Sequence, residues 1–267
     1  MFEEPYRWVE AVGNRRYYLD EQFKQGSPVV AASYRDGVLV LTVSKGTPKL
    51  YEIYDRIALG GMGHPADLEK LRFSLLEMAH LEGFNRSPSD VTGARLMKYG
   101  LAPAIKQAFE EVYKAPFIVK ILLAELGSRA DRDVFLTINY DGAFEEAARH
   151  AVLAATPAIQ VDMVAHLASR IDGSSDLHQA LDGALETWAL ASIAQQRDAD
   201  AAEHGKGEPE KPDPAAPDRQ AIDGHLELAL KDKNVECAIL ERHASGTSKY
   251  RGIAQDELRR LLPNTLR

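Results

Sequence analysis

The run Val-Leu-Val-Leu-Thr-Val over residues 38–43 is the feature that most constrains the fold. A strand with apolar residues at successive positions is buried on both of its faces. The turn Arg35-Asp36-Gly37 joins this run to the strand-like segment 28–34, which predicts an antiparallel hairpin. A hairpin that needs cover on both faces indicates a layered sandwich rather than an open, half-solvated sheet.

The rest of the chain alternates short strands with pairs of helices. The pattern predicts strands over 50–53, 56–59, 117–126, 134–140, 151–155, 225–230 and 235–240, and helices over 65–83, 90–112, 159–171, 177–188 and 253–262. His64 is expected to cap the first of these helices, and Pro103 to kink or restart the second. Antiparallel strands with helices arriving in pairs favour an α+β fold, a four-layer α-β-β-α sandwich.

Three parts of the chain are expected. Residues 1–25 form a polar, aromatic-bearing segment that is mostly helical and interrupted at Gly13-Asn14. Residues 26–262 form the sandwich domain, and residues 263–267 form a tail. Within the domain, residues 197–223 contain Pro209, Pro212, Pro214 and Pro217 among charges and lose all periodicity, so we expect a disordered insertion there.

Composition excludes several classes of function. The net charge is −8 and there is no basic tract, which argues against a nucleic-acid partner. The single cysteine, Cys237, allows no internal disulfide, and we expect a buried, inert thiol. No apolar run approaches the ~20 residues needed to span a bilayer, and the acidic start is unlike a signal peptide. We therefore expect a cytoplasmic protein without a membrane partner.

No motif for a cofactor or metal stands out. Gly60-Gly61-Met62-Gly63 precedes a predicted helix, but no Gly-Lys-Ser/Thr follows and no parallel βαβ unit surrounds it. The eight histidines are scattered without metal-ligand spacing. We expect neither a metal site nor a cofactor.

Four stretches carry a resemblance to a known family: Gly37-Val38-Leu39, Lys49-Leu50-Tyr51-Glu52-Ile53-Tyr54-Asp55-Arg56, Asp90-Val91-Thr92-Gly93 and Ile138-Asn139-Tyr140-Asp141-Gly142. In this order the chain resembles 20S proteasome subunits, most closely α-type subunits of the actinobacterial kind. The resemblance extends from about residue 14 to residue 262. The fold of that family, shared with N-terminal nucleophile hydrolases, is the same α-β-β-α sandwich.

The resemblance also bears on catalysis. Proteasome β subunits are proteases that expose an N-terminal threonine, assisted by an acid and a lysine. Aligned on the hairpin, Ser27 falls at the nucleophile position, Lys49 at the lysine position and Val43 at the acid position, and Pro28 follows the would-be nucleophile. This implies an α-type subunit with no catalytic residue. A hydrolase that releases Ser27 by cleavage after Gly26 remains an alternative, since an activated serine can serve as nucleophile.

For an α-type subunit, the resemblance implies three roles. The chain would close a homo-heptameric ring through its leading helix, with Trp8, Tyr17, Tyr18 and Phe23 as apolar contact surface. Phe2, Glu3, Glu4, Pro5 and Tyr6 would gate the axial pore. Lys49, Gly26 and Gly63 would bind the C-terminal tail of a ring-shaped ATPase, while β-type subunits stack below. A homologue that forms rings without any protease partner is a further alternative.

Overall fold

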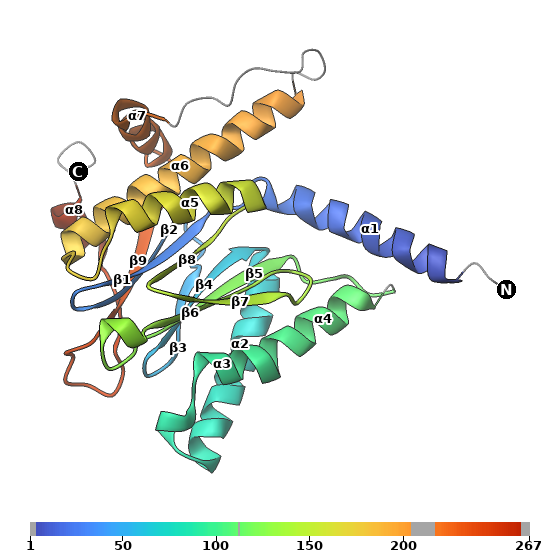
Figure 1. Cartoon of the computed structure of the whole chain (residues 1–267), viewed down its shortest axis with the longest axis horizontal. Helices are drawn as coiled ribbons and strands as arrows, with labels where there is room; N and C mark the ends of the chain where they lie inside the picture. Colours follow the sequence, from blue (N-terminus) through green and yellow to red (C-terminus); the bar gives the residue numbers. More distant parts are fainter. Residues whose placement is uncertain (1–3, 112, 204–216, 263–267) are drawn as a thin grey trace.

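The computed structural model describes residues 4–111, 113–203 and 217–262. Its centre consists of two five-stranded sheets that lie face to face, with helices outside them (Figure 1). All strand pairs are antiparallel. The predicted α-β-β-α sandwich is confirmed.

The first sheet has the order β10-β9-β2-β1-β8. Its strands are β1 (Val29–Tyr34), β2 (Gly37–Ser44), β8 (His150–Leu153), β9 (Asn234–Glu241) and β10 (Tyr250–Gly252). Every residue of β1 and β2 is buried, so the apolar run does lie in a covered sheet. A Cβ at Gly37 would lie 2.0 Å from the carbonyl oxygen of Leu240, so only glycine lets β9 pair this closely with the hairpin turn.

The second sheet has the order β3-β4-β5-β6-β7. Its strands are β3 (Leu50–Tyr54), β4 (Ile57–Gly63), β5 (Val119–Glu125), β6 (Val134–Ile138) and β7 (Phe144–Ala148). β7 is exposed along its whole length at the edge of this sheet. The strands predicted before residue 155 are therefore confirmed. The structure has one further strand, β7, which follows the turn after Tyr140.

One helical layer covers the second sheet. It contains α2 (Pro65–Asn85), the short turns η1 (Pro88–Asp90), α3 (Gly93–Arg95) and η2 (Leu96–Leu101), and α4 (Ala102–Glu110). His64 Nδ1 accepts a hydrogen bond of 3.3 Å from the Ala66 N–H, which confirms the predicted cap. The π-helical turn η2 ends at Leu101, and α4 starts at Ala102 with Pro103 in its first turn, so the predicted restart of the helix is confirmed as well.

The other layer, α5 (Pro157–Arg170) and α6 (Leu177–Glu203), packs on the first sheet (Figure 1). Its apolar side chains join the strands in the larger of two core clusters, which includes Met163, Leu181 and Trp188. Cys237 is buried in the same cluster, and burial raises the pKa of its thiol, as expected for an inert cysteine. The remaining elements are η3 (Ala130–Arg132), α7 (Arg219–Ala229) and α8 (Gln255–Leu261).

The predicted break in the N-terminal helical segment is wrong. α1 (Glu4–Phe23) is a single helix, with no break at Gly13-Asn14. A Cβ at Gly13 would meet nothing within 4 Å, so this glycine costs the helix only its lower propensity, ~1 kcal/mol. In Figure 1, α1 extends from the sandwich like an arm, and its C-terminal end meets the sheets.

Two predictions about the chain around the end of α6 and after it are also wrong. Residues 197–203 continue α6 and residues 219–223 begin α7, so the prediction of disorder over 197–223 is wrong at both ends. Residues 204–216 lie outside the described residues. The predicted strand over 225–230 is instead part of α7, which Asp218 caps and which buries Ile222 and Leu226, four residues apart.

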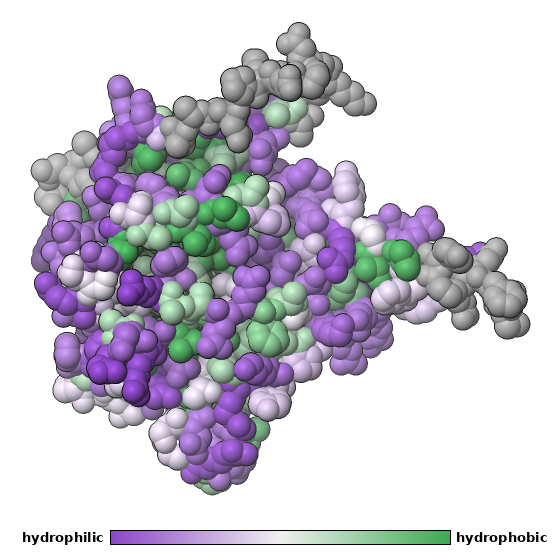
Figure 2. Space-filling model, in the orientation of Figure 1, coloured by the Kyte–Doolittle hydropathy of each residue, from purple (hydrophilic) through white to green (hydrophobic). Residues whose placement is uncertain are grey.

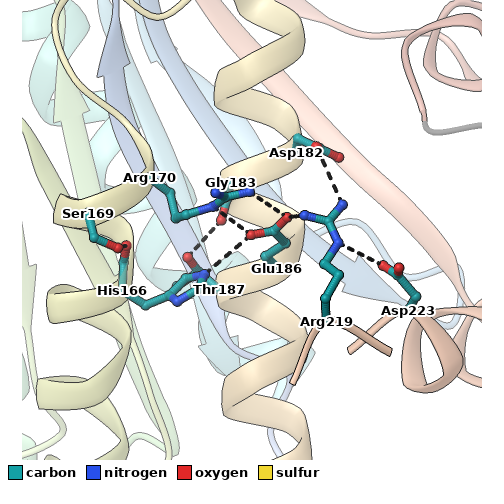
Figure 3. A network of polar contacts seen from close by, with 9 residues as sticks. All are labelled: His166, Ser169, Arg170, Asp182, Gly183, Glu186, Thr187, Arg219 and Asp223. Carbon is teal, nitrogen blue, oxygen red and sulfur yellow. Dashed lines mark hydrogen bonds and ion pairs between the residues drawn. The ribbon is translucent and has the colours of Figure 1, made fainter. Parts of the chain in front are cut away.

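A buried carboxylate holds α7 in place (Figure 3). Glu186 on α6 has a side chain only 4% exposed and forms ion pairs with Arg170 of α5, at 2.7 Å, and with Arg219 at the start of α7. Arg219 also contacts Asp223, at 3.3 Å. Because a buried carboxylate needs such partners, these contacts tie three helices together around one residue.

Candidate functional site

Ser27 and the predicted tail-binding residues lie at one end of the sandwich, where β1 and β3 begin and β4 ends. Gly26 follows α1 directly, and its N–H donates to the Phe23 carbonyl at 2.9 Å. The Gly61 N–H donates to the Lys49 carbonyl at 2.9 Å, which brings Lys49 beside the last residues of β4. The fold thus gathers Gly26, Lys49 and Gly63 around one strand end.

The Ser27 hydroxyl is bound on both sides. It donates to the Val43 carbonyl at 2.6 Å and accepts from the Trp188 indole N–H at 3.0 Å. The Thr42 hydroxyl lies 3.3 Å away. None of these three groups is a base at neutral pH, and among the described residues no hydrogen bond joins Ser27 to Lys49.

This arrangement gives Ser27 a structural role. At Val43, the residue that the resemblance aligns with an acid, the backbone carbonyl accepts the hydrogen bond from the serine hydroxyl. The indole of Trp188, a residue only 1% exposed, finds its partner in Ser27. The hydroxyl therefore satisfies a buried donor of α6 and links α6 to the loop after α1.

Gly63 and Gly26 are required by the fold itself. Gly63 has φ +130°, and a Cβ there would lie 2.1 Å from the Ile118 carbonyl oxygen. A Cβ at Gly26 would lie 2.4 Å from the Met62 side chain. The close packing of neighbouring atoms therefore explains both glycines without any ligand.

Lys49 is half-buried, and Glu236 holds its backbone in place. Glu236 of β9 accepts from the backbone N–H groups of Lys49 and Leu50, at 2.9 and 2.8 Å. Burial lowers the pKa of the Lys49 ammonium group, partly offset by the charge of Glu236. Burial also raises the pKa of Glu236, against its hydrogen bonds. Sequence reasoning missed Glu236, although a single acid inside the apolar run 235–240 was a visible signal.

Hydrogen bonds and two buried side chains fix the C-terminal half of α1 over this end. Arg15 donates to the carbonyls of Ala108 and Phe109, at 3.0 and 2.8 Å, at the end of α4. The Tyr140 hydroxyl donates to Asp20 at 2.7 Å. Leu19 and Phe23 are fully buried.

Lys120 supports α1 from within the sandwich. Its ammonium nitrogen lies 4.8 Å from the centre of the Phe23 ring and donates to the Ala154 carbonyl at 2.9 Å. Burial lowers the pKa of Lys120 to about 8, against the charges of Asp20 and Asp141. α1 is therefore a docked part of the domain at its C-terminal half.

Comparison with curated proteins decides the family. Over 224 residues, 82% of this chain and 84% of the relative, the chain is 30% identical to the proteasome subunit alpha of Kineococcus radiotolerans. Over 183 residues, 67% of this chain and 68% of the relative, it is 32% identical to that of Streptosporangium roseum. The chain belongs to the proteasome α-subunit family. No family model matches it.

Coverage differs among these relatives. The match to the proteasome subunit alpha of Actinosynnema mirum is 32% identical over 142 residues but spans only 53% of that relative's length. The two-sheet sandwich and the predicted resemblance to actinobacterial α subunits therefore agree with the comparisons, while activity and partners are matters for proposal.

The gate residues predicted for an α subunit are placed only in part. Phe2 and Glu3 lie outside the described residues. Glu4, Pro5 and Tyr6 form the first turn of α1 rather than a separate segment before it.

Two apolar surfaces of this α subunit are exposed. On α1, Trp8 is 48%, Tyr17 70% and Tyr18 48% exposed, and apolar atoms show on its N-terminal half in Figure 2. Phe23, predicted to belong to this contact surface, is instead buried against its own chain. On α2, a groove of about 620 Å³ is lined by Phe73, Leu76, Glu77, His80, Leu81 and Phe84.

The described residues contain no group of His, Cys, Asp or Glu side chains arranged to hold a metal ion. Within the same part of the chain, no helix is both long and apolar enough to cross a membrane.

Proposed function

We propose that this chain is a noncatalytic α-type subunit that forms the outer, seven-membered ring of a proteasome and controls entry to it. Membership of the α-subunit family supports the assignment. The observation that carries it is the chain from α1 to Ser27: α1 ends at Phe23, four residues before Ser27, whose hydroxyl is hydrogen-bonded to Val43 and Trp188. With the preceding residues attached, the Ser27 nitrogen is an amide and not a free amine, and none of the hydrogen-bond partners of its hydroxyl in the described chain is a base.

Ring closure would use α1. Its N-terminal half extends away from the domain with Trp8 and Val9 exposed, while its C-terminal half is docked by Arg15 and Phe23. An exposed apolar helix face next to a fixed anchor suits a heterologous contact repeated around a rotation axis. The apolar groove on α2, at the far side of the second sheet, would then face a β-type subunit.

Tail docking would use Lys49, Gly26 and Gly63. A chain-terminal carboxylate is captured by an ammonium group and by open backbone N–H groups, and glycine permits that close approach. The three residues lie around one strand end, and Glu236 fixes the Lys49 backbone from below. Residues at the start of α1 would gate the pore, and we keep the cytoplasmic location as a prediction.

Negative-stain microscopy tests the assignment. The purified chain, alone and coexpressed with a threonine-bearing β-type subunit, is imaged. We expect sevenfold rings that stack on β rings and hydrolyse peptides only in the coexpressed particle. Peptide hydrolysis by this chain alone would support the serine hydrolase instead, and rings that never bind a β-type subunit would support a ring without a protease partner.

A further inference from the structure

A cavity of about 210 Å³ lies where β1 ends and β8 begins, next to η3 and the loop between α5 and α6. Its volume is below the ~300–1,000 Å³ of sites for drug-sized molecules, so it suits a smaller ligand. The residues that matter for its chemistry are the half-buried His150 and three charged residues, Asp131, Arg149 and Asp172.

Arg149 holds an unfavourable backbone conformation beside this cavity. Its φ of +71° lies in the left-handed region, and no other residue except glycine has a positive φ in the described chain. Glycine adopts this conformation freely, whereas a residue with a Cβ is strained in it. The Ser33 N–H supports the conformation by donating to the Arg149 carbonyl at 2.6 Å. A strained arginine that lines a cavity indicates a functional position.

The side chain of Arg149 has no partner within the described chain. Its guanidinium group forms neither an ion pair nor a hydrogen bond there. Next to it, burial and then the charge of Arg149 lower the pKa of His150. The His150 ring is therefore neutral at pH 7 and offers one N–H donor, for which the described residues provide no acceptor.

Asp172 supplies the opposite charge. The hydrogen bonds that its carboxylate accepts from Ser174 and Ser175 all end on Oδ1, and they lower the pKa of this group. Within the described residues, Oδ2 accepts no hydrogen bond and Asp172 forms no ion pair. Asp131, by contrast, is paired with Arg129 at 3.2 Å. The cavity is thus lined by one unpaired cation and one unpaired anion that do not pair with each other.

We propose that this cavity binds a small zwitterion, a free amino acid or a short peptide. Arg149 and the His150 N–H bind the carboxylate of the ligand, and Asp172 Oδ2 binds its ammonium group. A ligand with both charges compensates both unpaired groups at once, whereas a simple anion or cation leaves one of them without a partner. The site also accounts for an arginine where glycine would be less strained.

This site does not depend on the proposed ring or on tail docking. Its residues lie at the end of the sandwich opposite to Lys49.

Calorimetric titration of the full-length chain tests the proposal. The two probes, L-alanine and L-alanyl-L-alanine, separate a free amino acid from a short peptide. The N-acetylated form of each probe lacks the ammonium charge, and the C-terminal amide lacks the carboxylate. We expect at least one of the two zwitterions to bind, and each of its blocked forms to bind about tenfold more weakly or worse, the effect of one charge-assisted contact.

Two variants test the residues, and a third is the control. Arg149→Gly removes the guanidinium group and suits the left-handed backbone, so it should raise the Tm of the chain while weakening zwitterion binding by about tenfold. Asp172→Asn keeps an oxygen for the hydrogen bonds within its loop and should weaken zwitterion binding by about tenfold, without weakening that of the N-acetylated probe. Arg35→Met removes an exposed arginine that does not line the cavity and should bind like the wild type.

Three outcomes would overturn the proposal. The first is that neither zwitterion binds the wild-type chain. The second is that an N-acetylated probe binds as tightly as the zwitterion, which would show a simple anion site. The third is that Arg149→Gly gains stability and still binds like the wild type, which would show that the strained turn serves no ligand.

Discussion

At the end of the sandwich where β1 and β9 finish, the side chain of Asp133 is fully buried and both of its carboxylate oxygens accept hydrogen bonds. Its carboxylate accepts from Arg242 at 2.8 and 3.0 Å, from the Ser33 hydroxyl at 2.8 Å and from the Gly127 N–H at 2.8 Å. At the opposite end, Lys45 and Lys233 follow the last paired residues of β2 and β9, and the Lys49 backbone is bound to Glu236 of β9. Within the described residues, none of these three lysines forms an ion pair.

The difference separates two uses of charge. A buried ion pair with several hydrogen bonds fixes structure, and removing one partner leaves the other without compensation. Charge that the fold leaves unpaired is available to a partner from outside. We therefore assign stability to the Asp133 pair and tail recognition to the end with Lys49.

The largest effect on stability is expected at the end of the sandwich with Asp133. Asp133→Asn leaves Arg242 buried without its counter-charge and should reduce the free energy of unfolding by about 3–5 kcal/mol. Chemical denaturation measures this. Asp131→Asn, in an exposed ion pair with Arg129, is the matched control and should cost less than ~1 kcal/mol. Equal losses in the two variants would contradict the contrast between the two ends.

The next largest effect is expected for Lys49→Ala, at the opposite end of the sandwich. We expect rings to assemble as in the wild type while stimulation of degradation by a ring ATPase is lost, because the tail carboxylate loses a contact of about 1.5–3 kcal/mol. Degradation of an unfolded protein by the assembled particle, with and without ATPase, measures it, with Lys98→Ala as control. Undiminished stimulation in Lys49→Ala would refute the tail site.

A smaller effect is expected for Ser27→Ala. The Trp188 N–H then lacks its partner, which should cost about 1–2 kcal/mol of stability. Peptide hydrolysis by the particle with β-type subunits should stay unchanged. Loss of hydrolysis with rings intact would show that the serine is a nucleophile.

The smallest expected effect is an increase in stability rather than a loss. Lys233→Met removes a repulsive charge and should raise the stability of the free chain by a few tenths of a kcal/mol. Because the pKa of Lys233 is lowered in the folded chain, the destabilising effect of its charge is full below that lowered pKa and disappears as pH rises toward the ordinary lysine pKa of 10.5. The gain in the variant should therefore be present at pH 7 and shrink at high pH. Thermal unfolding across this range measures it, and a loss of stability at pH 7 would argue that Lys233 serves packing on Trp188.

Much of the fold followed from local signals. The turn Asp36-Gly37 and the apolar run after it predicted β1 and β2, and the stripe Leu68, Leu71, Leu75 predicted the buried face of α2. Predictions failed where distant contacts override local pattern. α1 passes through Gly13 because Arg15 and Phe23 anchor the helix, and the apolar run 225–230 is helical because α7 docks on α6.

The site was predictable only in part. Lys49, Gly26 and Gly63 came from the family resemblance, and the fold does bring them to one strand end. Lys45 and Lys233 could not be found from sequence, because only the register of β2 against β9, strands far apart along the chain, places them opposite each other.

Intact mass of the chain taken from an assembled, active particle tests the central claim most directly. We predict that residues 4–26 remain attached, so that α1 still covers the junction and the chain controls entry rather than cutting. A mass that begins at Ser27, in material that hydrolyses peptides without any other subunit, would contradict the account.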